Sequence, residues 1–135
     1  MRVDGDDYRH RGAPAAPAPL TDAEVRQRAD LSATSTLDDF DELLQHLAVV
    51  HPSRYGSLVE GVSSACWTSV STVTDHAAAL RLVVLADRLY DRDVPVVTSG
   101  VPLDQLFSAD LLRGGYRKKY FRALSRLVAL AREAR

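Results

Sequence analysis

The 135-residue sequence contains a single cysteine, Cys66, so no disulfide can form within the chain. Because Cys66 lies in an apolar run, we expect a small buried side chain rather than a reactive thiol. No apolar run approaches the roughly 18 to 20 residues of a membrane-spanning helix. The N-terminus, with its early aspartates and arginines, does not resemble a signal peptide. These absences favour a soluble protein of a reducing, cytoplasmic compartment.

Motifs that carry chemistry are also missing. The sequence has no Gly-x-x-x-x-Gly-Lys-Ser/Thr loop for nucleotide phosphates, and no serine stands in a Gly-x-Ser-x-Gly setting. The histidines are scattered, and none has a second one at the i, i+4 spacing typical of helical metal sites. We therefore predict no catalytic residue and no metal site, and a chain that is not a self-sufficient enzyme.

Charge is present in abundance but is unevenly distributed. Residues 1–112 carry 9 basic and 17 acidic side chains, whereas residues 113–135 carry 8 basic and 1 acidic. The basic residues of this last segment alternate with Tyr116, Tyr120 and Phe121, a composition that suits phosphate contact and stacking. These aromatics also fall on the apolar stripe of a helix, which favours a place in the core. A solvated face, an acidic partner and nucleic acid all remain open as interpretations of the basic segment.

The N-terminal third begins with an extended segment. Residues 12–19 contain three prolines, which fix the backbone and remove hydrogen-bond donors, so residues 1–19 are predicted to be an extended segment with an Ala/Pro connector. The remaining residues, 20–135, are predicted to form one α/β region. Its first helix begins at Thr21, where Glu24 completes a capping box, and ends near Asp30. Few of its residues are apolar, so we expect it to be peripheral.

A second, amphipathic helix is predicted from Leu37 to the His51-Pro52 pair, which ends it. Its acidic residues Asp38, Asp39 and Asp41 are expected in the first turn, where they favour the helix dipole. A further turn of helix is expected around residues 57–60. The apolar residues that recur at helical spacing are Leu37, Phe40, Leu43, Leu44 and Leu47.

A strand, a helix and a strand follow in order, at residues 62–70, 72–92 and 94–98. The helix is long enough for the crossover between two parallel strands, so the fold class is α/β, built on a βαβ unit with flanking helices. A short helix near residues 103–107 and a last helix after Gly114-Gly115 complete the chain. Two strands alone leave both sheet edges unpaired, which indicates that the sheet belongs to a larger one.

Two segments carry a family resemblance. Residues 79–92 end in Leu-Ala-Asp-Arg-Leu-Tyr-Asp-Arg, and residues 122–127 read Arg-Ala-Leu-Ser-Arg-Leu. Together with the intervening strand and the Ser99-Gly100 turn, they resemble the C-terminal region of the ZapE-type (AFG-one-like) ATPases. These are P-loop proteins related to the AAA+ group, bacterial cell-division factors with mitochondrial relatives. Asp7-Tyr8-Arg9 is similar to the element that follows that family's catalytic core.

The resemblance implies the C-terminal portion of a P-loop NTPase-type fold, with the catalytic half in sequence that precedes this chain. It implies ATP and Mg as cofactors of the intact family, none for this chain alone, and a protein partner of the division machinery. It also implies that Arg126 is a second-sensor arginine that reaches a nucleotide phosphate; an ion pair with Asp87 or Asp91 is the alternative. The matching motif residues are Asp87, Tyr90, Asp91, Arg122, Ser125, Arg126 and Leu127.

A function of another class fits the same residues. In it, the chain is a stand-alone interaction module whose basic last helix binds an acidic protein or, less readily, nucleic acid.

Overall fold

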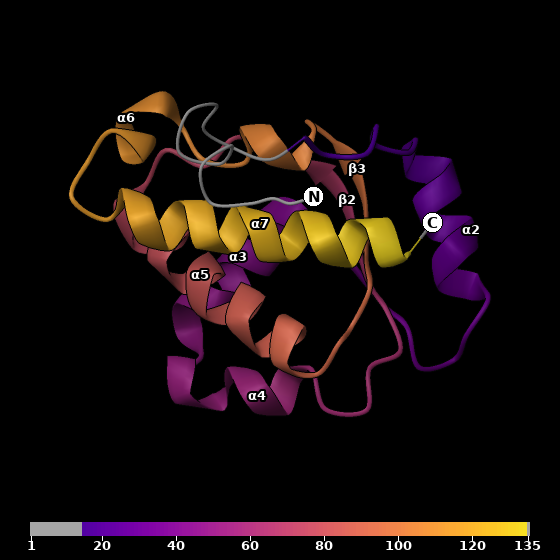
Figure 1. Cartoon of the computed structure of the whole chain (residues 1–135). Coiled ribbons are helices and arrows are strands. Elements are labelled where there is room, and N and C mark those ends of the chain that lie inside the picture. The colour runs from indigo at the N-terminus through magenta and orange to yellow at the C-terminus, as the bar shows by residue number, and fades with distance from the viewer. Residues whose placement is uncertain (1–14, 135) are drawn as a thin grey trace.

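The computed structural model describes residues 15–134 (Figure 1). Its three strands are β1 (Thr36–Asp39), β2 (Ala65–Val70) and β3 (Val96–Gly100). The helices are α2 (Asp22–Asp30), α3 (Phe40–Val49), α4 (Tyr55–Leu58), α5 (His76–Asp91), α6 (Ala109–Leu112) and α7 (Arg117–Glu133), with 3-10 turns at Pro52–Arg54 and Leu103–Gln105. Residues 15–19 form neither helix nor strand. The rest of the predicted extended segment, with Asp7-Tyr8-Arg9, lies outside the described residues.

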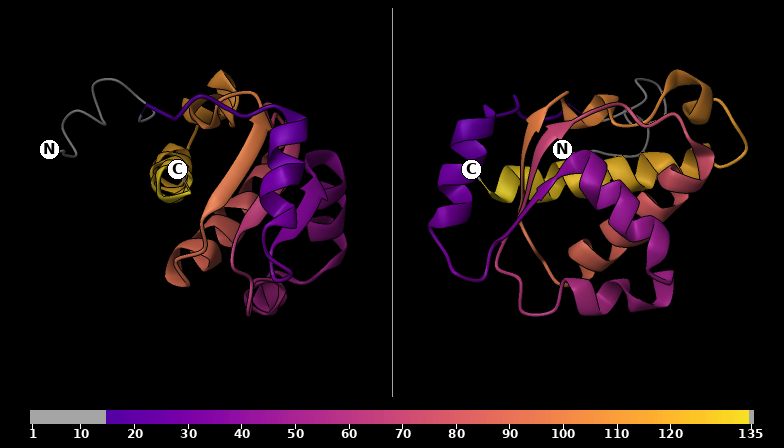
Figure 2. Two further views of the ribbon diagram at one scale, coloured as in Figure 1. Left: turned by 90° about the vertical axis from the view of Figure 1, so that its right-hand side faces the viewer. Right: turned by 180° about the vertical axis from the view of Figure 1, so that it is seen from behind.

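The three strands form a parallel sheet in the order β1-β2-β3. The α2 helix packs on one face, and α3, α5 and α7 cover the other. The left view of Figure 2 shows α7 on the β3 side of the sheet and α3 on the β1 side. The predicted α/β class is therefore confirmed, and the β2-α5-β3 segment is the expected βαβ unit with shifted strand boundaries.

The third strand, β1, corrects the prediction of a helix that starts at Leu37. Residues 36–39 pair in parallel with residues 65–68 of β2, and α3 begins only at Phe40. Asp39 caps α3, because its side chain accepts a hydrogen bond from the Glu42 amide at 3.2 Å. Pairing with β2 thus overrides the local helical pattern, and two of the acids expected in the first turn lie before the helix.

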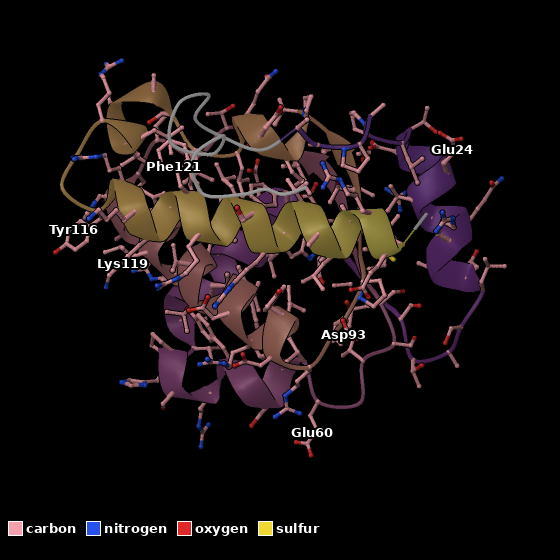
Figure 3. All side chains as sticks on the ribbon, in the orientation of Figure 1. Glu24, Glu60, Asp93, Tyr116, Lys119 and Phe121 are labelled. Carbon is pink, nitrogen blue, oxygen red and sulfur yellow. The ribbon has the colours of Figure 1, made fainter. Side chains whose placement is uncertain are left out.

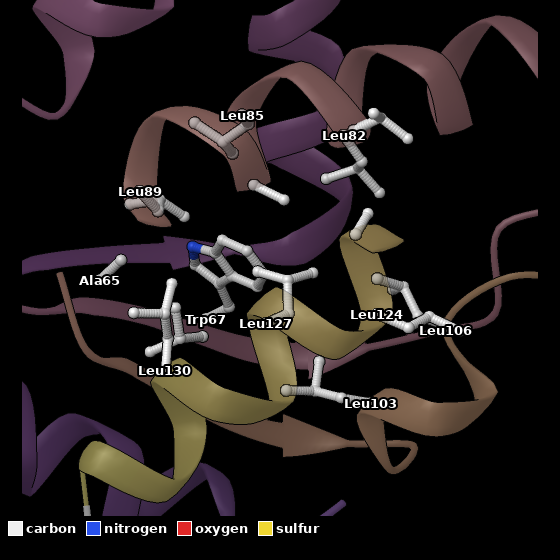
Figure 4. Close-up of a cluster of buried hydrophobic side chains, with 14 of the residues drawn as sticks. Ala65, Trp67, Leu82, Leu85, Leu89, Leu103, Leu106, Leu124, Leu127 and Leu130 are labelled. Carbon is white, nitrogen blue, oxygen red and sulfur yellow. The ribbon is translucent and has the colours of Figure 1, made fainter. Parts of the chain in front are cut away.

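The main core lies between the sheet and α3, α5 and α7 (Figure 4). Trp67 of β2 is at its centre, with Phe40 at a ring distance of 6.1 Å. The helices contribute apolar residues at i, i+3, i+4 and i+7, so each presents one continuous stripe to the sheet. The most completely buried leucines of this core are Leu47, Leu82, Leu89, Leu106, Leu124, Leu127 and Leu130.

A smaller core on the opposite face corrects the expectation that the first helix is peripheral. Val25 of α2 is fully buried, and with Ala29 it packs on Cys66 and Val97. Two apolar residues one turn apart are enough to seat a helix on the sheet. The expected burial of Cys66 is confirmed, because this face encloses its side chain.

The two edges of the sheet differ. Leu20 runs beside β3, and its amide donates to the Thr98 carbonyl at 2.9 Å, so part of that edge is covered. On the other side, β1 is the outermost strand among residues 15–134. None of the helices in this part of the chain is long and apolar enough to cross a bilayer.

Candidate functional site

Three of the motif residues meet where α5 packs on α7. Arg126 of α7 precedes the buried Leu127, so its side chain lies at the edge of the interface between α5 and α7. Its Nη1 donates to Asp87 Oδ1 of α5 at 2.6 Å, and the guanidinium carbon lies 4.9 Å from the centre of the Tyr90 ring. The arginine is thus held between a carboxylate and an aromatic face.

This ion pair is the alternative that the sequence left open for Arg126. The side chains of Arg126 and Asp87 keep 30% and 21% of their exposure, so water screens the pair only in part. A partly buried pair with a cation–π contact contributes about 1 to 2 kcal/mol. The ion pair therefore joins α5 to α7 through two residues that are 39 positions apart in sequence.

The other motif residues are dispersed. Asp91 binds Arg88 of its own helix at 2.9 Å, as a largely exposed pair. Leu127 is fully buried in the core, Ser125 is half-buried, and Arg122 is exposed on α7. The motif as a whole therefore marks the α5–α7 interface rather than one cluster of polar groups.

A second polar group lies at the carboxyl ends of β2 and β3, where open parallel sheets bind their ligands. Ser99 is 1% exposed; its hydroxyl donates to Asp22 Oδ1 and accepts from the Ser69 amide at 2.9 Å. The Ser69 hydroxyl donates to Asp22 Oδ2 at 3.1 Å. The Ser99 hydroxyl lowers the pKa of Asp22, with further help from Ser69.

The backbone around this network is strained. The register between β2 and β3 shifts after Trp67, and Ser69 has a φ of 57°. Gly100 has a φ of 103°, and a Cβ there would lie 2.3 Å from the Val70 carbonyl oxygen. Only glycine fits this position. Residue patterns do not reveal the network, because Asp22 and Ser99 are 77 residues apart.

The basic start of α7 forms a third surface (Figure 3). Tyr116 keeps 45% of its exposure, contrary to its predicted place in the core, and lies between Lys119, at 5.6 Å, and the His76 ring, at 5.1 Å. Tyr120 is buried as expected, and its hydroxyl forms a hydrogen bond with His76 Nδ1 at 3.2 Å. Within residues 15–134, no three metal-binding side chains come together.

The fold and these sites define a class: an α/β protein with a three-stranded parallel sheet and flanking helices, compatible with a portion of a P-loop NTPase. The family model for the AFG1-like ATPases matches residues 5–134. The chain therefore belongs to the AFG1-like ATPase family. Membership indicates an ATPase-related function, and it implies that intact members of the family use a nucleotide. No curated protein and no solved structure matches the chain.

Proposed function

We propose that this chain is the C-terminal part of a ZapE-like cytoplasmic ATPase that couples hydrolysis of ATP, bound with Mg, to remodelling of a protein in the division machinery. The observation that carries the proposal is the family match over residues 5–134. The chain itself contributes nucleotide-sensing and regulatory surface, because its sequence has no phosphate-binding loop.

Within this function, Arg126 is proposed as the second-sensor arginine. A guanidinium presents five N–H donors in a planar fork, and the contact with Asp87 uses one of them. Tyr90 supports the guanidinium from α5, so it is already oriented while a third of its surface remains open. A phosphate oxygen approaching from that side would meet donors that need little reorganisation.

The test uses a family ATPase that carries both the phosphate-binding loop and the Ser-Arg-Leu motif of residues 125–127. Changing the arginine at the position of Arg126 to alanine should lower kcat by at least about tenfold. Changing the aspartate at the position of Asp87 to asparagine breaks the ion pair but keeps the arginine. We expect that variant to lose stability in urea while its kcat stays within about threefold.

The two variants separate a nucleotide contact from a helix clamp. If Arg126 acts only as a clamp, both variants lose similar stability and turn over ATP at the parental rate, which would refute the sensor role. Lysine at the position of Arg126 serves as the conservative control. It should restore part of the turnover, since it keeps the charge but loses the fork.

The second candidate function, a stand-alone interaction module, is favoured by the exposed cations of α7. Arg117, Lys118, Lys119 and Arg122 make no ion pair with a carboxylate of residues 15–134. Three of them occupy the first turn, where the helix dipole disfavours positive charge. Such a placement costs stability unless an anionic partner neutralises it.

Fluorescence anisotropy tests this function with two probes, a single-stranded oligonucleotide and a poly-glutamate peptide. Binding that weakens steeply between low and moderate salt, and that the double change Lys118→Glu and Lys119→Glu abolishes, would support it. Arg88→Glu, on an exposed part of α5, is the matched control. Absence of binding to both probes at low salt would remove this candidate.

A further inference from the structure

The outer edge of β1 has backbone groups that pair with no strand of residues 15–134. The Thr36 amide donates to the Ser64 carbonyl at 3.0 Å, so Thr36 and, two residues on, Asp38 face β2. The N–H and C=O of Leu37 consequently point away from the sheet. No strand of the described chain lies on that side, and the right view of Figure 2, from behind, shows β1 in front of the other two strands.

A cavity of about 370 Å³ opens beside this edge, on the face that α3 and α5 cover. Its walls are mainly apolar, and they include Leu43, Leu85 and Leu89 as well as β1 itself. This volume lies within the range of ligand pockets in proteins, so the cavity has room for a large aliphatic side chain. The β1 edge and the cavity are therefore adjacent parts of one surface, which we call the β1 groove.

Trp67 supplies a polar group to the groove. The residue is 2% exposed and lines the cavity, and its indole nitrogen donates to no residue between 15 and 134. Figure 4 shows this nitrogen on the side of the ring toward Leu85 and Leu89, two residues of the cavity wall. The nitrogen is not fully enclosed by protein atoms, so it is open to the cavity, where a carbonyl oxygen brought in by a ligand could accept its hydrogen bond.

The rim of the groove is acidic. Asp38 lines the cavity, and Asp39, Asp41 and Glu42 follow it along the chain. None of these carboxylates forms an ion pair with a described cation. Burial raises the pKa of Asp38, while His46 opposes and Glu42 reinforces that shift. A cation placed beside Asp38 would therefore relieve a partly desolvated charge.

We propose that the β1 groove binds an extended, basic segment of a partner protein. The segment adds a fourth strand to β1, places an aliphatic side chain in the cavity, and sets a lysine or arginine beside Asp38. Backbone hydrogen bonds to Leu37 give affinity, and the cavity and the acidic rim give specificity, as in other cases of strand addition. A second copy of this chain fits less well, because two β1 edges would bring Asp38 and Asp39 against their own counterparts.

The sequence contains one tryptophan, so intrinsic fluorescence reports directly on the groove. The probe is the synthetic peptide acetyl-Thr-Lys-Thr-Leu-Thr-Lys-Thr-amide, whose leucine and lysines lie on one face of an extended strand; it is titrated into the full chain. We expect a saturable shift of the Trp67 emission. The same peptide with glutamate at every basic position should bind at least about tenfold more weakly.

Backbone pairing is tested on the peptide, where protein folding is untouched. Two N-methylated versions carry methyl groups on alternate amides, in opposite registers. One register blocks the amides that face β1 and should abolish binding, while the other leaves them free and should bind like the parent. Equal binding of both versions would overturn strand addition.

Two substitutions test the rest of the groove. Asp38→Asn should weaken binding about tenfold, while Asp110→Asn, which removes an exposed charge on α6, should leave it unchanged. Ala65→Leu, which fills the cavity from β2, should also abolish the emission shift.

The proposal fails if no shift appears by about 1 mM peptide, if the acidic peptide binds equally, or if Asp38→Asn matches its control. It also fails if the chain dimerises through β1 and the peptide does not compete.

Discussion

The two faces of the sheet are held by different kinds of interaction. On the face of α3, α5 and α7, a continuous apolar core surrounds Trp67. On the α2 face, Val25 and Ala29 make a small apolar contact, and the hydrogen bonds around Asp22 tie the start of the helix to the strand ends. Apolar area secures the first face, whereas the second depends on a few polar contacts. We therefore expect α2 to open before the rest of the structure does.

The largest loss of stability is expected on the face covered by α3, α5 and α7. Leu127→Ala removes a fully buried side chain from the centre of the α7 stripe and should lower the free energy of unfolding by about 3 kcal/mol. Urea unfolding followed by circular dichroism measures the change. Leu31→Ala, at a leucine that is 80% exposed, is the control and should stay within about 0.5 kcal/mol. Equal losses in the two variants would contradict the assigned core.

A smaller and more local effect is expected on the α2 face. Val25→Ala removes two methyl groups from a fully buried site and should cost about 2 kcal/mol of α2 docking. Amide hydrogen exchange should then speed up in α2 while β2 and β3 keep their protection. Faster exchange throughout the sheet would mean that the two faces unfold as one unit, and the contrast between them would be lost.

The smallest expected effect depends on pH. The folded pKa of Asp22 lies below its ordinary value of 3.8, chiefly because of the Ser99 hydroxyl. Its stabilising contribution is therefore fully present above about pH 5 and is lost as the pH falls through 3.8 toward the folded pKa. Urea unfolding from pH 6 to pH 3 should show that Ser99→Ala loses less stability than the parent over this range. If the free energy of unfolding falls equally with pH in Ser99→Ala and in the parent, Asp22 is not the titrating group.

Repeated apolar spacing made the long helices predictable. The stripes of α3, α5 and α7 each extend over several turns, so the periodicity is strong, and the β2-α5-β3 order follows from length alone. The strand β1 escaped prediction because it has only four residues, two of them aspartates, which are rare in strands. Only its neighbour β2 makes it a strand. The burial of α2 was missed for a similar reason, since two apolar residues give almost no periodic signal.

Of the candidate sites, too, some were predictable from the sequence and others were not. The contact of Arg126 with Asp87 was foreseen as one of two alternatives, because both residues stood in recognisable motifs. The Asp22 network was not predicted, because Asp22 lies at the start of a predicted helix and Ser99 in a predicted turn, and neither position marks a polar site. The β1 groove could not be foreseen at all without the third strand. Contacts between residues far apart in sequence depend on the sheet order, which local patterns do not encode.

The burial of Cys66 allows the rate of thiol labelling to report how often α2 moves away from the sheet. The thiol is fully enclosed on the α2 face, and burial raises its pKa, so a thiol reagent meets neither an accessible nor an ionised sulfur while the helix is docked. Each modification therefore records one undocking event. Since Cys66 is the only cysteine, the labelling rate of the unaltered protein measures how often this face opens.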